Sequence, residues 1–215
     1  MHQPIFITGI GTGIGKTLIA AIVTEALEAD YWKPVQAGFE DGTDSLTVKN
    51  LLSNSRSIIQ AETYRLAFPA SPHIAAQKEN IQISLEKIYA DFERIGTQSD
   101  RLVIEGAGGI QVPLNAQEFV SDLIKKLQAS VILVSRNYLG SINHSLLTAA
   151  FCKTRGLDVL GWIFNDQYLD YADEIVQWSG YPKLGSIPVT TRIDRTFVRE
   201  QADHLRTRLQ QAIRF

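Results

Sequence analysis

Short apolar runs alternate along this chain with longer stretches in which apolar residues recur every three or four positions. The first run, Pro4–Thr8, is β-rich, and helical spacing follows it in Leu18, Ile22 and Val23. The run Val131–Val134 is continuously apolar, which is typical of a central parallel strand buried on both faces. The alternation predicts one α/β domain over residues 1–215, with a doubly wound, mostly parallel sheet and helices on both faces.

The same two patterns predict the remaining elements. We expect further strands at Tyr31–Val35, Arg101–Ile104, Ser130–Ser135, Val159–Phe164 and Leu184–Pro188. We expect helices at about Ser84–Gln98, Val120–Gln128 and Ser141–Arg155. A further helix is expected to follow Asp44, which would cap it, and another is expected from Asp194 onward. Loops are predicted at Gln36–Asp44 and Glu62–Asn80, and the second is long enough to be a binding segment.

Composition and charge exclude several classes of protein. The formal net charge of -2 gives no broad attraction to nucleic acid or to an anionic membrane, and neither is expected as a partner. The single cysteine, Cys152, excludes an internal disulfide and is predicted to be a small buried hydrophobe in a reducing compartment. Without a leader or a run of about 18 apolar residues, the chain is predicted to be cytoplasmic. His73 and His144 lack metal-ligand spacing and are predicted to be hydrogen-bonded structural residues.

The stretch from Gly9 to Thr17, which reads G-I-G-T-G-I-G-K-T, predicts a binding site for a nucleotide phosphate. Its glycines let backbone N–H groups face an anion, the following helix offers its positive end, and Lys16 adds a full charge. The Thr17 hydroxyl suits a magnesium ion. Gly9 precedes Gly15 by one residue more than the regular P-loop pattern allows. The order of strand, glycine loop and helix nevertheless favours a phosphate site over an ordinary tight turn.

Other polar residues follow the predicted strands, where the ligands of doubly wound sheets bind. Lys33, Glu105 and Asn165 stand at or near the ends of three strands. An acid on the wall of a phosphate site can hold magnesium, so these groups suit phosphoryl transfer. From the residues alone, Glu105 can also be a solvated turn residue, Asp44 a helix cap, and Lys33 an edge lysine that discourages aggregation.

Six blocks of sequence, taken together, indicate a family. They are Thr8–Thr17, Lys33–Val35 with Gly38, Ser71–His73, Glu105–Gly109, Leu139–His144 and Gly161–Asp166. In this order, over about residues 4–190, they resemble dethiobiotin synthetase. The resemblance implies a P-loop NTPase fold and an ATP-dependent cyclo-ligase of biotin synthesis. This enzyme would convert 7,8-diaminononanoate and CO2 to dethiobiotin, ADP and phosphate, through a carbamate and a carbamic-phosphoric anhydride.

The resemblance also implies roles for residues at matching positions. Nucleotide would be bound by Gly13, Ile14, Gly15, Lys16, Thr17, Leu18, Asp44, Glu105, Gly106, Ala107, Gly108, Asn165, Asp166, Ile187, Pro188 and Val189. Mg2+ would be held by Thr17, Asp44 and Glu105, and the catalytic residues would be Lys33, Lys16 and Thr12. In a homodimer with the substrate site at the subunit interface, substrate would meet Lys33 and Ala37, and, from the partner subunit, Leu139, Gly140, Ser141 and Asn143.

Two departures from the family pattern change side-chain contacts, and neither removes a charge that phosphoryl transfer needs. Ala37 stands where family members often carry a serine or threonine, so a hydroxyl contact to substrate is missing. Gly11 and Gly13 replace acids found in some members, which keeps the backbone cradle. We therefore expect activity with altered substrate affinity.

Two other classes stay open beside the synthetase. A regulatory or partitioning ATPase of the deviant P-loop kind usually has an extra lysine early in the loop, where this chain has Ile10 and Gly11. Another amide-forming ligase or kinase on the same fold is also open. The Lys-Pro-Val and Ser-Pro-His blocks favour the synthetase over it.

Overall fold

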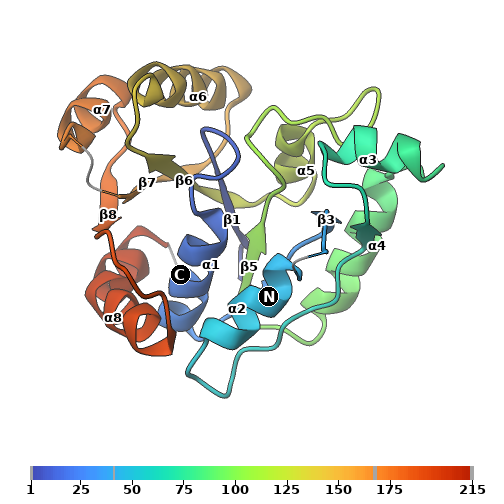
Figure 1. Ribbon diagram of the computed structural model, residues 1–215, viewed down its shortest axis with the longest axis horizontal. Helices are drawn as coiled ribbons and strands as arrows, with labels where there is room; N and C mark the ends of the chain where they lie inside the picture. Colours follow the sequence, from blue (N-terminus) through green and yellow to red (C-terminus); the bar gives the residue numbers. More distant parts are fainter. Residues whose placement is uncertain (1, 41, 167–168, 214–215) are drawn as a thin grey trace.

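A six-stranded parallel sheet forms the centre of the computed structural model, which describes residues 2–40, 42–166 and 169–213 (Figure 1). In spatial order its strands are β2 (Asp30–Trp32), β5 (Leu102–Glu105), β1 (Ile5–Gly9), β6 (Ser130–Arg136), β7 (Val159–Asn165) and β8 (Lys183–Ile187). Every neighbouring pair is parallel. All six strands thus point their carboxyl ends to one edge, where a doubly wound sheet binds its ligands.

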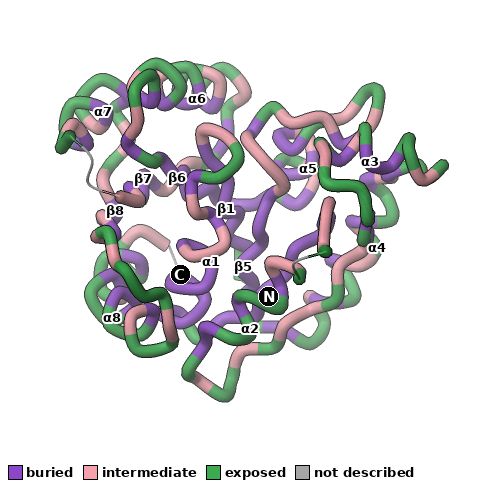
Figure 2. The backbone as a smooth tube through the Cα atoms, viewed as in Figure 1, coloured by how far each residue is buried: buried purple, intermediate pink, exposed green. Residues whose placement is uncertain are grey.

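Side chains alternate between two apolar clusters, one on each face of the sheet. Trp32, Ile104 and Leu133 belong to the first cluster, whereas Tyr31 and Val103 belong to the second. Figure 2 shows buried residues along the strands and on the inner sides of the helices. Burial on both faces explains why the strands are continuously apolar in sequence.

Helices cover both faces, as the sequence predicts. The cluster that contains Trp32 includes residues of α4 (Leu85–Gly96), α5 (Val120–Lys126), α6 (Ser141–Arg155) and α7 (Ala172–Ser179). The cluster that contains Tyr31 includes residues of α1 (Lys16–Leu27), α2 (Asp44–Leu51) and α8 (Arg195–Ala212). Figure 1 shows α1 beside α8 on that second face. The doubly wound architecture is therefore confirmed.

The prediction of a single strand at Tyr31–Val35 is wrong. It divides into β2 and β3 (Val35–Ala37), which takes the start of the predicted Gln36–Asp44 loop. Pro34 has no backbone N–H and cannot donate in a ladder, so the pairing with β5 ends before it. β3 pairs instead with β4 (Tyr64–Leu66) in a separate two-stranded parallel sheet.

The predicted loop Glu62–Asn80 also contains regular structure, namely β4 and the short helix α3 (Pro72–Lys78). Pro72 stands in its first turn, where proline needs no hydrogen-bond partner. Helix α7 has no counterpart among the sequence predictions. At α2, the cap is Thr43, whose side chain accepts a hydrogen bond from the Leu46 N–H, so Asp44 is not the cap as predicted.

Cys152 lies fully buried in the first cluster, which confirms its prediction as a small core residue. Burial raises the pKa of its thiol to about 12. Among the described residues, no helix combines the length and apolar character needed to cross a membrane.

Candidate functional site

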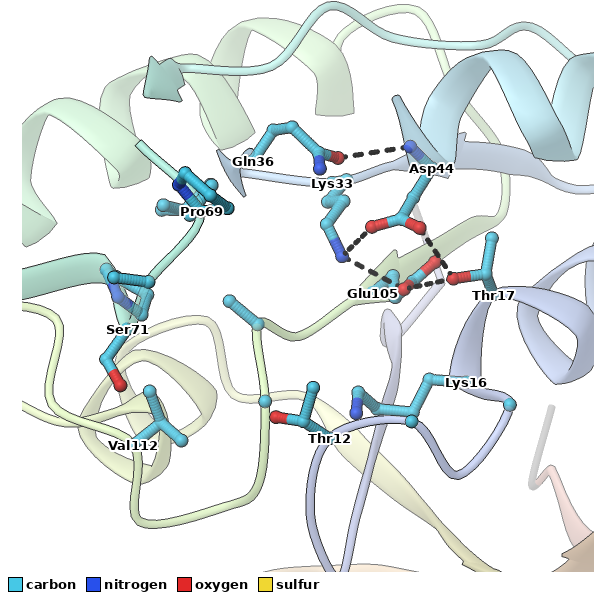
Figure 3. A pocket seen from close by; sticks show the side chains of 18 residues that line it. Thr12, Lys16, Thr17, Lys33, Gln36, Asp44, Pro69, Ser71, Glu105 and Val112 are labelled. Atoms are coloured by element: carbon cyan, nitrogen blue, oxygen red, sulfur yellow. Dashed lines mark hydrogen bonds and ion pairs between the residues drawn. The ribbon is translucent and has the colours of Figure 1, made fainter. Parts of the chain in front are cut away.

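A cleft of about 720 Å³ opens at the carboxyl edge of the sheet (Figure 3). Its walls come from the loop after β1, the end of β2, the strand β3, the segment 69–72 and the loop after β5. The charged side chains that line it are Lys16, Lys33, Asp44 and Glu105. Residues far apart in sequence thus meet where the topology predicts a ligand.

The glycine-rich loop leads directly into α1. Gly15 is the residue before the helix, with φ of 87°, a left-handed conformation that favours glycine. A Cβ at this position would also overlap Asn165 Nδ2. The Lys16 Nζ atom donates a hydrogen bond to the Gly11 carbonyl at 2.6 Å and thereby spans the loop. Burial lowers the pKa of Lys16 to about 8.

Beside the loop, Lys33 lies between two carboxylates. Its Nζ atom is 2.8 Å from Asp44 Oδ2 and 2.9 Å from Glu105 Oε1. The Thr17 hydroxyl lies 2.9 Å from Asp44 Oδ1 and 2.9 Å from Glu105 Oε1, close enough to donate to either (Figure 3). Glu105 ends β5 and is 2% exposed. These four residues form one hydrogen-bonded network, which we call the Lys33 cluster, and Lys33 and Glu105 are its buried members.

Charge pairing fixes the protonation states of Lys33 and Asp44. Burial by itself would lower the pKa of Lys33, but the Glu105 and Asp44 carboxylates raise it above its usual range. Burial would raise the pKa of Asp44, whereas Lys33 and the Thr17 hydroxyl hold it below its usual range. Lys33 is therefore a cation and Asp44 an anion at neutral pH.

The oxygen atoms of Thr17, Asp44 and Glu105 suit a hard cation such as magnesium. Among the described residues there is no group of three or more histidine, cysteine, aspartate or glutamate side chains that could hold a metal by itself. Magnesium in nucleotide sites commonly uses one or two carboxylates together with substrate phosphates. The donor set therefore fits Mg2+ that arrives with a nucleotide.

The other predicted nucleotide residues fall into two groups. Gly13, Ala107 and Gly108 line the cleft, and so does Thr12, which is predicted to be catalytic. The Gly106 N–H donates to the Ile7 carbonyl, which ties the loop after β5 to β1.

The second group lies across the glycine loop from the Lys33 cluster. There, Asn165 Nδ2 donates to the Ile14 carbonyl at 3.0 Å, and the Asp166 N–H donates to the Ile187 carbonyl at 3.1 Å. Val189 is 71% exposed beyond the end of β8, just after Pro188, and Leu18 is partly buried in α1.

Of the predicted substrate residues, Lys33 and Ala37 line the cleft, but Leu139, Gly140, Ser141 and Asn143 do not. The latter four lie at the start of α6, where Gly140 precedes the helix with φ of 100°.

Sequence reasoning missed two residues that support the acids of the site, one through the Glu105 carboxylate and one through the Asp44 backbone. The Tyr31 hydroxyl donates to Glu105 Oε2 at 2.7 Å, and Gln36 Oε1 accepts from the Asp44 N–H at 3.1 Å. Period-two alternation along Tyr31–Lys33 places Tyr31 on the Lys33 side of the sheet, which was the available signal. The predicted hydrogen bond is present for His144, which pairs with the Tyr138 hydroxyl at 2.8 Å. It is not found for His73, whose buried Nδ1 has no partner among the residues that the structure describes.

Comparisons with known proteins agree with this geometry. A family model described as "AAA domain" matches residues 3–196. A protein of Christiangramia forsetii named ATP-dependent dethiobiotin synthetase BioD is 46% identical, over 97% of this chain and 99% of its own length. A Cytophaga hutchinsonii protein of the same name is 47% identical, over 90% and 92%. The chain belongs to the dethiobiotin synthetase family.

Solved structures with a P-loop fold share the fold of this chain. The MinD protein of Pyrococcus horikoshii, solved with Mg-ADP, has a TM-score of 0.59 and covers 99% of this chain and 93% of its own. A ParA family ATPase of Chlorobium tepidum has a TM-score of 0.55, with 98% and 93% covered. Their identities of 18% and 15% show the fold alone. The synthetase relatives, and not these structural neighbours, therefore decide the family.

Proposed function

We propose that this chain catalyses the ATP-dependent conversion of 7,8-diaminononanoate and CO2 to dethiobiotin, ADP and phosphate. Dethiobiotin formation is the activity named for the relatives that share most of its length. The observation that carries the proposal is the Lys33 cluster beside the glycine loop, because a held cation and a magnesium donor set meet there. Such a site suits phosphoryl transfer, which depends on positioning and charge neutralisation.

The nucleotide would lie along the glycine loop, with its phosphates at Gly13–Leu18. Backbone N–H groups at the start of α1 and the Lys16 ammonium would meet the phosphate oxygens. Thr17, Asp44 and Glu105 would hold Mg2+, which when bound neutralises charge on the phosphates. The loop that contains Gly106 and the region of Asn165, Asp166 and Ile187–Val189 would hold the rest of the nucleotide.

The proposed chemistry requires three bonds to form in turn. One amine of the substrate attacks CO2 to give a carbamate, and a carbamate oxygen attacks the γ-phosphate with ADP leaving. The second amine then attacks the carbonyl carbon of the anhydride, expels phosphate and closes the ureido ring. Lys33 and Thr12 face the cleft where these anions would form, and Lys33 is held as a cation that stabilises them.

We propose further that the chain is a homodimer with its substrate site at the interface. Leu139 is 97% exposed, and Leu147 of α6 is 61% exposed beside a groove of about 620 Å³ that Ile110 and Phe151 also line. Apolar side chains exposed beside such a groove are typical of an interaction surface. Helix α6 begins without a side-chain cap, so its N-terminus can receive a substrate carboxylate from the neighbouring subunit.

Sedimentation velocity tests the dimer. Leu147→Glu places a charge in the groove and is expected to give a monomer, whereas Trp178→Glu, at a 56% exposed position on α7, is expected to leave the dimer intact. A dimeric Leu147→Glu variant would place the interface elsewhere. A cytoplasmic location stays a prediction from the sequence.

The activity is tested by measuring ATP hydrolysis with and without 7,8-diaminononanoate plus bicarbonate, followed by mass detection of the product. We expect ADP and a ureido product in equal amounts, only when the diamine is present. An ATP hydrolysis rate that is the same with and without the diamine, with no ureido product, would favour a regulatory ATPase. Phosphoryl transfer to another acceptor would favour a different ligase or kinase.

A further inference from the structure

We infer that Tyr31 is a positioning residue that fixes the Glu105 carboxylate so that only Oε1 faces the nucleotide site. The Tyr31 hydroxyl donates to Oε2 at 2.7 Å, while Oε1 is the atom that contacts Lys33 and Thr17. The two oxygens of one carboxylate thus have separate tasks. This role of Tyr31 depends on the proposed magnesium site.

The hydroxyl can act only through Glu105, because Tyr31 does not line the cleft. Tyr31 is fully buried and belongs to the apolar cluster shared with α1 and α2. It is paired with Val103 in the sheet, and Glu105 lies two residues farther along β5 on the same face. The Glu105 oxygen is therefore a diagonal neighbour within reach of a long aromatic side chain.

Two hydrogen bonds to the segment 58–60 hold the backbone of Tyr31, so its ring has a fixed origin. Its N–H donates to the Ile58 carbonyl at 3.0 Å, and its carbonyl accepts from the Gln60 N–H at 2.8 Å. Among the described residues, Glu105 Oε2 receives no hydrogen bond other than that of Tyr31. Loss of this hydroxyl would leave a buried carboxylate oxygen unpaired and free the carboxylate to rotate about its own axis.

Partners that orient a metal-binding carboxylate typically change metal affinity about 10–100-fold when they are removed. We therefore expect Tyr31→Phe to weaken Mn2+ binding at least about 10-fold, measured by electron paramagnetic resonance titration in the presence of ADP. The Mg2+ concentration for half-maximal turnover should rise in parallel. The KM for 7,8-diaminononanoate should not change, because Tyr31 does not reach the cleft.

Tyr64→Phe is the matched control. The Tyr64 hydroxyl is also engaged, since it accepts from the Ser84 N–H at 3.0 Å, and the residue is buried on β4 away from the cleft. Its loss should leave Mn2+ binding unchanged. Equal weakening in both variants would overturn the inference, because a general loss of packing would then explain it.

Two further variants separate the possible failures. Asp44→Asn alters the proposed magnesium site directly. Weaker Mn2+ binding in Asp44→Asn, with wild-type binding in Tyr31→Phe, would overturn the role of Tyr31 alone. Wild-type binding in both would overturn the magnesium site as well.

A double variant keeps the test decisive if Tyr31→Phe folds poorly. In the Glu105→Gln background no Glu105 carboxylate remains for Tyr31 to orient, so adding Tyr31→Phe should cause little further loss of Mn2+ binding. An additive loss in the double variant would contradict the inference.

Discussion

Replacement of Lys33 by methionine isolates the charge of the Lys33 cluster, because methionine keeps an unbranched apolar stem and removes the ammonium. Removing one partner of a buried ion pair costs about 3–5 kcal/mol of unfolding free energy. Here the side chain of Asp44 is 33% exposed, and the Tyr31 and Thr17 hydroxyls remain beside Glu105. We therefore expect the lower end, about 3 kcal/mol, in urea denaturation without ligand.

The same variant should separate binding from turnover. Lys16 and the glycine loop remain, so ADP affinity measured by calorimetry should change little. The rate should fall about 10²–10³-fold, the usual effect of losing one charge-stabilising donor, as measured by mass detection of dethiobiotin. Mg-ADP should restore part of the lost stability, because the ion would replace the missing positive charge between the carboxylates.

Lys126→Met is the control for lysine removal as such. Lys126 pairs with Glu86 at 2.6 Å, with side chains 27% and 81% exposed, so its loss should cost less than about 1 kcal/mol and no activity. Loss of ADP binding in Lys33→Met would show that Lys33 binds the nucleotide. An unchanged rate would refute its role in charge stabilisation.

Three other variants test separate features. Burial alone would raise the pKa of Glu25, but hydrogen bonds from Ser53 and Asn54 hold it below the usual 4.5. The ionised Glu25 therefore stabilises the folded state above that pH, and this stabilisation is lost as the pH falls below it. Glu25→Gln should lower the urea midpoint at pH about 7 and converge with wild type in acid. Ala37→Ser should lower the KM for the diamine, and an unchanged KM would count against a missing hydroxyl contact. Gly15→Ala should weaken ADP binding in calorimetry, because a φ of 87° strains any residue with a side chain and the added methyl group would displace the Asn165 amide.

Sequence predicts the central sheet well because burial on both faces leaves a strong local signal. The strands β1, β5, β6, β7 and β8 all appear where apolar runs predict them, within a residue or two. The family resemblance, including the glycine loop, is likewise contained in short contiguous blocks. Family membership is confirmed by relatives of 46% and 47% identity.

Local sequence patterns could not predict the two-stranded sheet or the contacts that support the acids of the site. The pairing of β3 with β4 joins segments separated by a loop and the helix α2, and short paired runs are not distinctive by themselves. The contact of Tyr31 with Glu105 spans 74 positions in sequence and depends on strand register. Alternation in the sequence places Tyr31 on the same side as Lys33, but only the strand register shows that its hydroxyl meets Glu105.

The charges that line the cleft cancel one another, with Lys16 and Lys33 opposite Asp44 and Glu105. A balanced site produces little field at a distance, so it cannot draw a nucleotide from solution by long-range attraction. Capture must then depend on short contacts made after encounter, chiefly the N–H groups of the glycine loop. The association rate of ATP should therefore vary little with salt concentration, and selectivity for the nucleotide should lie in how slowly it leaves.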